Sequence, residues 1–182
     1  MNIKYTVPGM SDKNSTRVIE ILQTRLHAHN DLHLTLKHVH WNVVGPHFIG
    51  VHEMLDPQVE KVRDFADAVA ERIAALGVAP RGTVGAILKD RTWDDYALDR
   101  DTVPAHLAAL DLVYTGVVED TRKAIEKSGE IDPVTEDLLI GQAGDLEQFH
   151  WFVRAHLENA GGQLATRGAK TEEDAADKAR DL

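Results

Sequence analysis

Residues 38–56 of this chain, HVHWNVVGPHFIGVHEMLD, hold many side chains that can bind a metal. The segment contains four histidines, one glutamate and one aspartate. Imidazole and carboxylate groups are ligands that proteins use for iron and similar divalent metals. The chain has no cysteine, which excludes disulfides, thiolate catalysis and sulfur-ligated zinc. A metal site in this chain would therefore consist of nitrogen and oxygen ligands.

Two pairs of these side chains have the spacing of one helical turn. His52 and Asp56 are four residues apart, and so are Asp67 and Glu71 in the segment DAVAE. At about 100° per residue, all four positions fall within an arc of about 100° on one helix face. Asp56 and Asp67 are about 16 Å apart along a helix axis, whereas metal–ligand bonds are about 2 Å long. One chain therefore cannot bring these four ligands to the same ion.

A second copy of the helix removes this obstacle. The midpoint of positions 52 and 71 is 61.5, and the midpoint of positions 56 and 67 is also 61.5. Two antiparallel copies with a two-fold axis at that midpoint would set His52 opposite the partner's Glu71, and Asp56 opposite the partner's Asp67. His40 comes back beside His52 across a short turn and adds a fifth ligand. The spacing indicates a metal site that two subunits share.

These patterns also have plainer interpretations. A histidine and an aspartate four residues apart, or two carboxylates, often form a solvated helix face. Trp41 beside His40 is more often a core residue, although an indole next to a redox metal can absorb oxidising equivalents. HEMLD is close to the zinc-protease motif His-Glu-x-x-His, but Asp56 occupies its fifth position and Pro57 follows. We therefore reject the zinc-protease interpretation and keep Trp41 as a candidate beside the metal ligands.

Helices must position these residues. Ser11 and Asp12 offer N-caps for a first long helix that Gly45-Pro46 ends, and the sequence shows no strand pattern. The second expected helix has apolar residues at helical spacing over 51–76 and ends at Gly77, and Pro57 predicts a kink or a restart within it. The third expected helix covers 102–129. The fourth runs from Pro133 toward Gly161-Gly162. This pattern predicts an all-α four-helix bundle with a short extra helix in the connector between the second and third helices.

The composition is that of an ordinary globular protein. The 182 residues are 43% hydrophobic and 27% charged, and the net charge of −10 favours cations over a broad nucleic-acid interface. We expect an N-terminal arm over 1–10, one domain over 11–160, and a mobile polar tail over 161–182. The sequence has neither a signal-peptide pattern nor a run of roughly twenty apolar residues, so we expect a cytoplasmic protein without a membrane segment.

Three segments resemble the Dps proteins, the small ferritin-like proteins of starved bacteria. They are HVHWNVVGPHFIGVHEMLD, DAVAERIAALG and LEQFHWFVRAHLE, and the similarity covers roughly residues 8 to 160. The spaced set His-x11-His-x3-Asp-x10-Asp-x3-Glu is specific to the ferroxidase centre of that family. It falls here on His40, His52, Asp56, Asp67 and Glu71.

The resemblance implies a ferroxidase, with iron sites between two-fold-related subunits in a hollow shell of twelve copies. It implies that Fe(II) is oxidised, preferably by hydrogen peroxide, that ferric mineral is stored in the cavity, and that the cell is protected against oxidative stress. By position, Asp132 resembles the pore aspartate of the family, and Glu136 lies one turn further on. Asp132 also suits a helix N-cap, which Pro133 supports equally well.

The main departure from the family concerns DNA, which many members bind through basic tails. Residues 161–182 hold four basic and five acidic residues, and the N-terminal arm offers Lys4, Lys13 and Arg17 against Asp12. Nucleic-acid affinity requires several phosphates to be neutralised at once, so we expect weak or absent DNA binding at physiological salt. DNA condensation is thus a second hypothesis. Metal-dependent hydrolysis of an amide or ester is a third, although the sequence encodes no substrate pocket for it.

Overall fold

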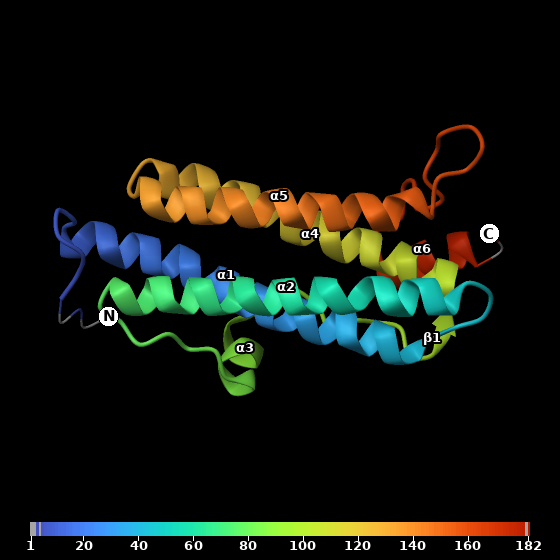
Figure 1. Cartoon of the computed structure of the whole chain (residues 1–182), viewed down its shortest axis with the longest axis horizontal. Coiled ribbons are helices and arrows are strands. Elements are labelled where there is room, and N and C mark those ends of the chain that lie inside the picture. Colours follow the sequence, from blue (N-terminus) through green and yellow to red (C-terminus); the bar gives the residue numbers. More distant parts are fainter. Residues whose placement is uncertain (1–2, 4, 181) are drawn as a thin grey trace. The chain divides into compact units, whose positions relative to one another are not determined.

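The computed structural model describes residues 3, 5–180 and 182, and helices make up most of this part (Figure 1). They are α1 (Asp12–Asn42), α2 (Phe48–Ala75), α3 (Val84–Asp90), α4 (Val103–Gly129), α5 (Pro133–Ala155) and α6 (Glu172–Ala179). The long helices α1, α2, α4 and α5 and the short connector helix α3 confirm the predicted all-α four-helix class. Lys4 of the arm lies outside the described residues. Within the described chain, no helix is long and apolar enough to cross a membrane.

The helix boundaries differ from the expected ones at two places. α2 continues through Pro57 without the predicted restart. Proline has no backbone N–H, so the carbonyl oxygen of Glu53 lacks its usual helical hydrogen bond. Both Pro57 and Glu53 are exposed, so water can hydrate this oxygen. α5 ends at Ala155, before the predicted stop at Gly161-Gly162, because the chain then turns back and Glu158 forms a bridge with Leu164.

A small parallel ladder follows the end of α1, although the sequence predicts no strand. β1 (Val43–Val44) pairs with β2 (Asp101–Thr102) in the register Val43↔Asp101 and Val44↔Thr102. Two residues are too few to show the alternation by which a strand is recognised in a sequence. The ladder ties the turn between α1 and α2 to the segment before α4.

The described chain divides into two compact units. The first unit comprises Met1–His33, Glu60–Trp93 and Asp120–Ala143, and the second comprises Leu34–Val59, Asp94–Glu119 and Gly144–Leu182. In the first unit, α1 and α2 supply most of the buried core, with contributions from α4 and α5. Its members are Val18, Ile19, Leu22, Leu26, Ala66, Val69, Ile73, Leu76, Ala124 and Leu139.

The N-terminal arm packs on the first unit. Ile3, Val7 and Met10 lie against its core. The Ser15 hydroxyl donates to the carbonyl oxygen of Leu76 at 3.0 Å, which links the start of α1 to the end of α2. These three described residues of the arm are thus packed on this unit.

The C-terminal segment differs from the mobile tail that the sequence predicts. Thr171 caps α6 by accepting a hydrogen bond from the backbone N–H of Asp174. Ala175, Ala176 and Ala179 are fully buried, and Ala176 packs in a cluster that is completed by Leu98, Ala105 and Ala109. Alanine-rich polar composition suggests disorder, but these alanines share one helix face and so can pack. At least residues 171–179 are therefore structured.

Within the second unit, a buried carboxylate on α4 fastens the chain segment between α5 and α6. Asp111 on α4 accepts hydrogen bonds from His150 Nε2 at 2.7 Å, Arg154 Nε at 2.7 Å and Thr166 Oγ1 at 2.6 Å. Burial disfavours the charged carboxylate, but these bonds outweigh the burial and lower the pKa of Asp111 to about 2. The charged network holds Thr166 of the C-terminal segment against α4.

Gly77 ends α2 as the sequence predicts, and it tolerates no side chain. Its φ is +92°, and an added Cβ would lie 1.6 Å from the carbonyl oxygen of Tyr5. We predict that Gly77→Ala lowers the free energy of unfolding by about 1–3 kcal/mol, because it adds backbone strain and displaces the arm. Chemical denaturation followed by circular dichroism measures this change. Gly85→Ala, where an added Cβ meets no atom within 4 Å, is the matched control; equal losses in the two variants would contradict the prediction.

Candidate metal centre

His40 and His52 lie side by side, as the short turn between α1 and α2 predicts. Their ring centroids are 3.6 Å apart and the rings are inclined by 22°. The turn between them includes Gly45, with a φ of +94°, and His47, with a φ of +65°. Two left-handed residues allow the chain to reverse within a few positions. The reversal places the last turn of α1 against the first turns of α2.

Each histidine is held by the backbone of the other. His40 Nδ1 lies 2.8 Å from the carbonyl oxygen of His52, and His52 Nδ1 lies 2.9 Å from the carbonyl oxygen of His40. A carbonyl oxygen only accepts, so both Nδ1 atoms carry the proton. In the neutral rings, both Nε2 atoms then keep a free electron pair. Fixing the tautomer in this way prepares an imidazole to bind a metal.

Asp56 is the third member of this group, and it has a lysine partner. Its Oδ1 lies 3.2 Å from His40 Nδ1 and 2.6 Å from Lys37 Nζ. The hydrogen bond from Lys37 is the main reason why the pKa of Asp56 is lowered, and the nearby histidines add to the effect. Asp56 is therefore a ready anionic ligand, but a cation must share it with Lys37 or displace that residue.

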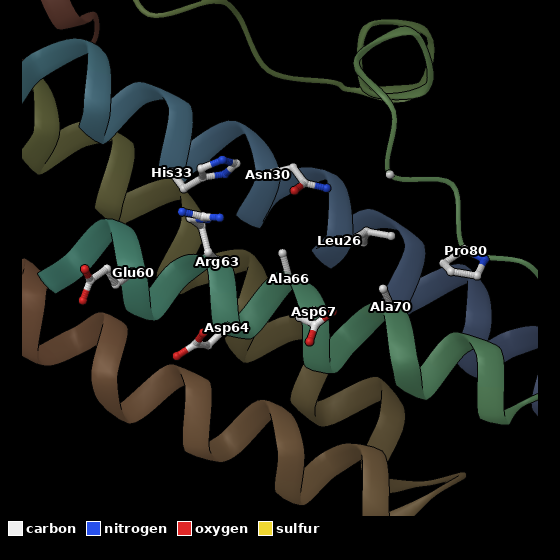
Figure 2. Close-up of a pocket in the computed structure, with 11 residues that line it drawn as sticks. Leu26, Asn30, His33, Glu60, Arg63, Asp64, Ala66, Asp67, Ala70 and Pro80 are labelled. Atoms are coloured by element: carbon white, nitrogen blue, oxygen red, sulfur yellow. The ribbon is translucent and has the colours of Figure 1, made fainter. Parts of the chain in front are cut away.

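Asp67 and Glu71 lie on exposed turns of α2 in the first unit. Asp67 lines an open groove of about 830 Å³ between α1, α2 and the segment around Pro80 (Figure 2). His40, His52 and Asp56 are neighbours. Among the described residues of this single chain, however, no three histidine, aspartate or glutamate side chains are arranged as ligands of one ion. The single chain therefore holds an incomplete ligand set, and Asp67 and Glu71 stay a predicted complement.

Trp41 is not the core residue that its type favours. It is 70% exposed, as expected for a position on the outer side of the last turn of α1. Phe48 instead contacts the histidine pair, with its ring edge-on to His52 at 6.0 Å between centroids. A role for Trp41 in absorbing oxidising equivalents stays a prediction.

Asp132 is buried, with 5% exposure, and is held by two neighbours. Arg72 Nη2 donates to its Oδ2 at 2.6 Å, and Thr135 Oγ1 donates at 2.5 Å. Burial opposes its charge, but the bonds from Thr135 and Arg72 lower its pKa. It directly precedes α5, so it satisfies the N-cap interpretation, while Glu136 lies close over Gly129. The pore role of Asp132 and Glu136 stays a prediction.

Lys37 is a neighbour of the candidate ligands that helix spacing alone does not identify. It precedes His40 by three residues and so lies on the same face of α1. That spacing indicates a neighbour of His40, but contact with Asp56 also requires the geometry of the turn. Only the folded turn sets the lysine and the carboxylate within bonding distance.

Comparison with known proteins identifies the architecture. A family model described as a ferritin-like domain matches residues 19–161. The DNA protection during starvation protein of Mycolicibacterium smegmatis is 69% identical over 176 residues, which are 97% of this chain and 96% of the relative. The solved structure of Mycobacterium smegmatis Dps superposes with a TM-score of 0.91 at 68% identity and covers 94% of this chain and 97% of that chain. Dps from Microbacterium arborescens in a high-iron form has a TM-score of 0.76 at 27% identity, over 85% of this chain and 99% of that one.

Replacing Lys37 tests its hold on Asp56. We predict that Lys37→Met raises the pKa of Asp56 toward its ordinary value, because the largest cause of the lowering is removed. Carboxyl resonances followed by NMR during an acid titration report this shift. The exposed Lys13→Met is the matched control and should leave Asp56 unchanged. An unchanged titration of Asp56 in the Lys37 variant would show that the bond is not formed in solution.

Proposed function

The chain belongs to the Dps family of ferritin-like proteins, and we propose that it is a ferroxidase that stores the oxidised iron. The single observation that carries this proposal is the pair His40 and His52, whose Nδ1–H groups are both bound to backbone oxygen. Each Nε2 is thereby available to an incoming metal. Beside them, Asp56 is kept anionic by a lowered pKa. Two imidazoles and a carboxylate suit Fe(II) and leave coordination positions for an oxidant.

The remaining ligands come from a second subunit. The shared midpoint of the two ligand pairs at 61.5 means that two antiparallel copies of α2 bring Asp67 and Glu71 of the partner subunit to the histidine cluster. Both residues are exposed on α2 and so are accessible to a partner. The two-fold axis then generates two identical sites, each with His40, His52 and Asp56 from one subunit.

The reaction that this ligand set supports is a two-electron oxidation. Two Fe(II) ions give one electron each to hydrogen peroxide, and with two protons they yield two Fe(III) ions and two water molecules. Peroxide accepts both electrons together, so no hydroxyl radical is released. Anionic carboxylates stabilise the ferric product more than the ferrous substrate, since the attraction grows with the charge of the ion. Peroxide consumption and iron removal would together protect the cell from oxidative damage.

Storage requires a shell, and we propose the twelve-subunit assembly of the family with ferric mineral in its cavity. The similarity to the Microbacterium arborescens protein in its high-iron form supports iron as the cargo. The net charge of −10 per chain would draw cations toward such a shell. Asp132 and Glu136 would line an entry pore, and iron is both substrate and stored product.

DNA protection is the second candidate, because it stands in the names of the relatives. The contacts of basic residues in the C-terminal segment argue against DNA binding. Lys178 pairs with Asp174 at 2.8 Å, and Arg180 pairs with Asp101 at 2.8 Å and also with Asp177. Two of the four basic residues of this segment are thus occupied within the chain. We therefore propose that protection comes mainly from iron chemistry and that DNA binding is weak.

Removing one imidazole tests the ferroxidase. We predict that His52→Ala slows peroxide-driven Fe(II) oxidation by about 100-fold or more, since even changes outside the ligand shell of a metal cost about 10–100-fold. Stopped-flow absorbance of the ferric product measures the rate, and sedimentation checks that the variant still assembles. His156→Ala, an exposed histidine after α5, is the control. A wild-type rate in the His52 variant would exclude this site.

A salt titration tests the DNA hypothesis. We predict that at about 150 mM salt the protein does not shift duplex DNA in a gel, because few phosphates are neutralised and binding falls steeply with salt. Lys178→Glu with Arg180→Glu should then change little. Tight binding at that salt concentration, lost in the double variant, would instead assign DNA binding to the C-terminal segment.

A further inference from the structure

The partner-facing side of α2 carries an unbalanced charge. Each residue of a helix is rotated by about 100° around the axis from the one before it. With His52 set at 0°, Glu71 lies at about 100° around the axis of α2, and we call the arc between these two positions the contact arc. The carboxylates within it are Glu53, Asp56, Glu60, Asp67 and Glu71. Lys61 and Arg72 lie at about 180° and 200°, outside the contact arc. Arg63, at about 20°, is therefore the only arginine or lysine in the contact arc of α2.

Arg63 and Glu60 are symmetric about the two-fold axis that the metal ligands require. Their midpoint is also 61.5, so each Glu60 is level with Arg63 of the partner subunit, at about 2 Å from the axis along the helix. Around the helix axis, Glu60 lies at about 80° and Arg63 at about 20°, so each is about 30° from the centre of the contact arc. No other residue pair within the contact arc lies so close to the axis.

The structure leaves both side chains accessible. Glu60 and Arg63 are exposed and line the open groove beside α2. Figure 2 shows Arg63 directed from α2 toward His33 on α1, whereas Asp64 and Asp67 point away from α1. Burial lowers the pKa of His33, and the charge of Arg63 adds to that effect. A neutral His33 leaves the guanidinium as the positive charge on this side of the groove.

We propose that Glu60 of each subunit binds Arg63 of the partner subunit, and that these two reciprocal ion pairs set the register in which the metal centres form. The proposal rests on the two-subunit site of the proposed function and names the residues that align it. Its physical basis is charge: when no iron is bound, facing carboxylates repel, and Arg63 supplies the attraction close to the axis.

The same pair opposes wrong registers. An axis displaced to position 60 sets Glu60 against Glu60, and an axis displaced to position 63 sets Arg63 against Arg63. Each displacement also separates Asp56 from Asp67 of the partner subunit, so neither forms a complete metal centre. Like charges that face each other in an interface are strongly unfavourable. The ion pairs therefore favour the one register that joins the two halves of the ligand set.

Reversing one charge at a time tests the pairing. Glu60→Arg sets four arginines around the axis, and Arg63→Glu sets four glutamates there. We expect each variant of the full chain to dissociate at a protein concentration at least about tenfold higher than the wild type does. Sedimentation velocity over a dilution series at low salt measures this concentration. Circular dichroism confirms that each exposed substitution leaves the subunit folded.

Complementation distinguishes the pairing from a merely local role of Arg63 beside His33. Mixing the two single variants sets the arginines of one against the glutamates of the other, so mixed assemblies should form at the wild-type concentration. The double variant Glu60→Arg with Arg63→Glu should also assemble by itself. Native mass spectrometry identifies mixed assemblies by the mass difference between the variants. If mixing and the double variant both fail to restore assembly, the proposal is overturned.

One control variant and two distinct outcomes complete the test. Glu119→Arg makes the same charge change at an exposed position on α4 and should assemble like the wild type. Normal assembly of both single variants would overturn the ion pairs even if His52→Ala still abolished iron oxidation. An assembled wild type that failed to oxidise Fe(II) would overturn the ferroxidase, while loss and rescue of assembly would still support the ion pairs.

Discussion

The span of α2 between Asp56 and Asp67 is the constraint on which the proposed metal centre depends. Eleven residues of α-helix extend about 16 Å, and no side-chain rotation brings both carboxylates to one ion. The chain carries the histidine half of the proposed site at the turn between α1 and α2 and the acidic half further along α2. Only a second subunit can join them, so the proposed chemistry exists only in the assembly. Any change that shifts two copies of α2 along each other would act on catalysis without touching a ligand.

A site shared in this way requires that the negative charges of its carboxylates be balanced. A site that gathers carboxylates from two subunits attracts iron, but before iron arrives the same groups repel each other. Lys37 partly offsets this repulsion at Asp56, where it lowers the pKa of the carboxyl. Arg63 would do so at the two-fold axis. Lys37 lies beside the candidate ligand Asp56, so Fe(II) binding there would exchange one positive partner of this carboxylate for another.

The sequence predicts those features that depend on local spacing. The positions of His40 and His52 follow from helix periodicity and a short turn, and Gly77 at the end of α2 follows from the need for a positive φ. Contacts that depend on how distant segments fold back are not encoded in spacing. The bond from Lys37 to Asp56 and the packing of Ala176 are of this kind. The sequence therefore predicts the fold class and the candidate ligands, but not the partners that adjust their charge.

The C-terminal segment shows why a count of basic residues is a poor measure of DNA affinity. Arg180 forms an ion pair with Asp101, and the preceding helix α6 buries three alanines. A phosphate that recruits Arg180 must replace that carboxylate, and a tail that extends to reach DNA must expose Ala176. The apparent affinity is then the intrinsic affinity multiplied by the fraction of undocked tails. Twelve copies would multiply the contacts, but each copy would have to undock first. The docking of α6 thus opposes DNA binding by this segment, whatever its net charge.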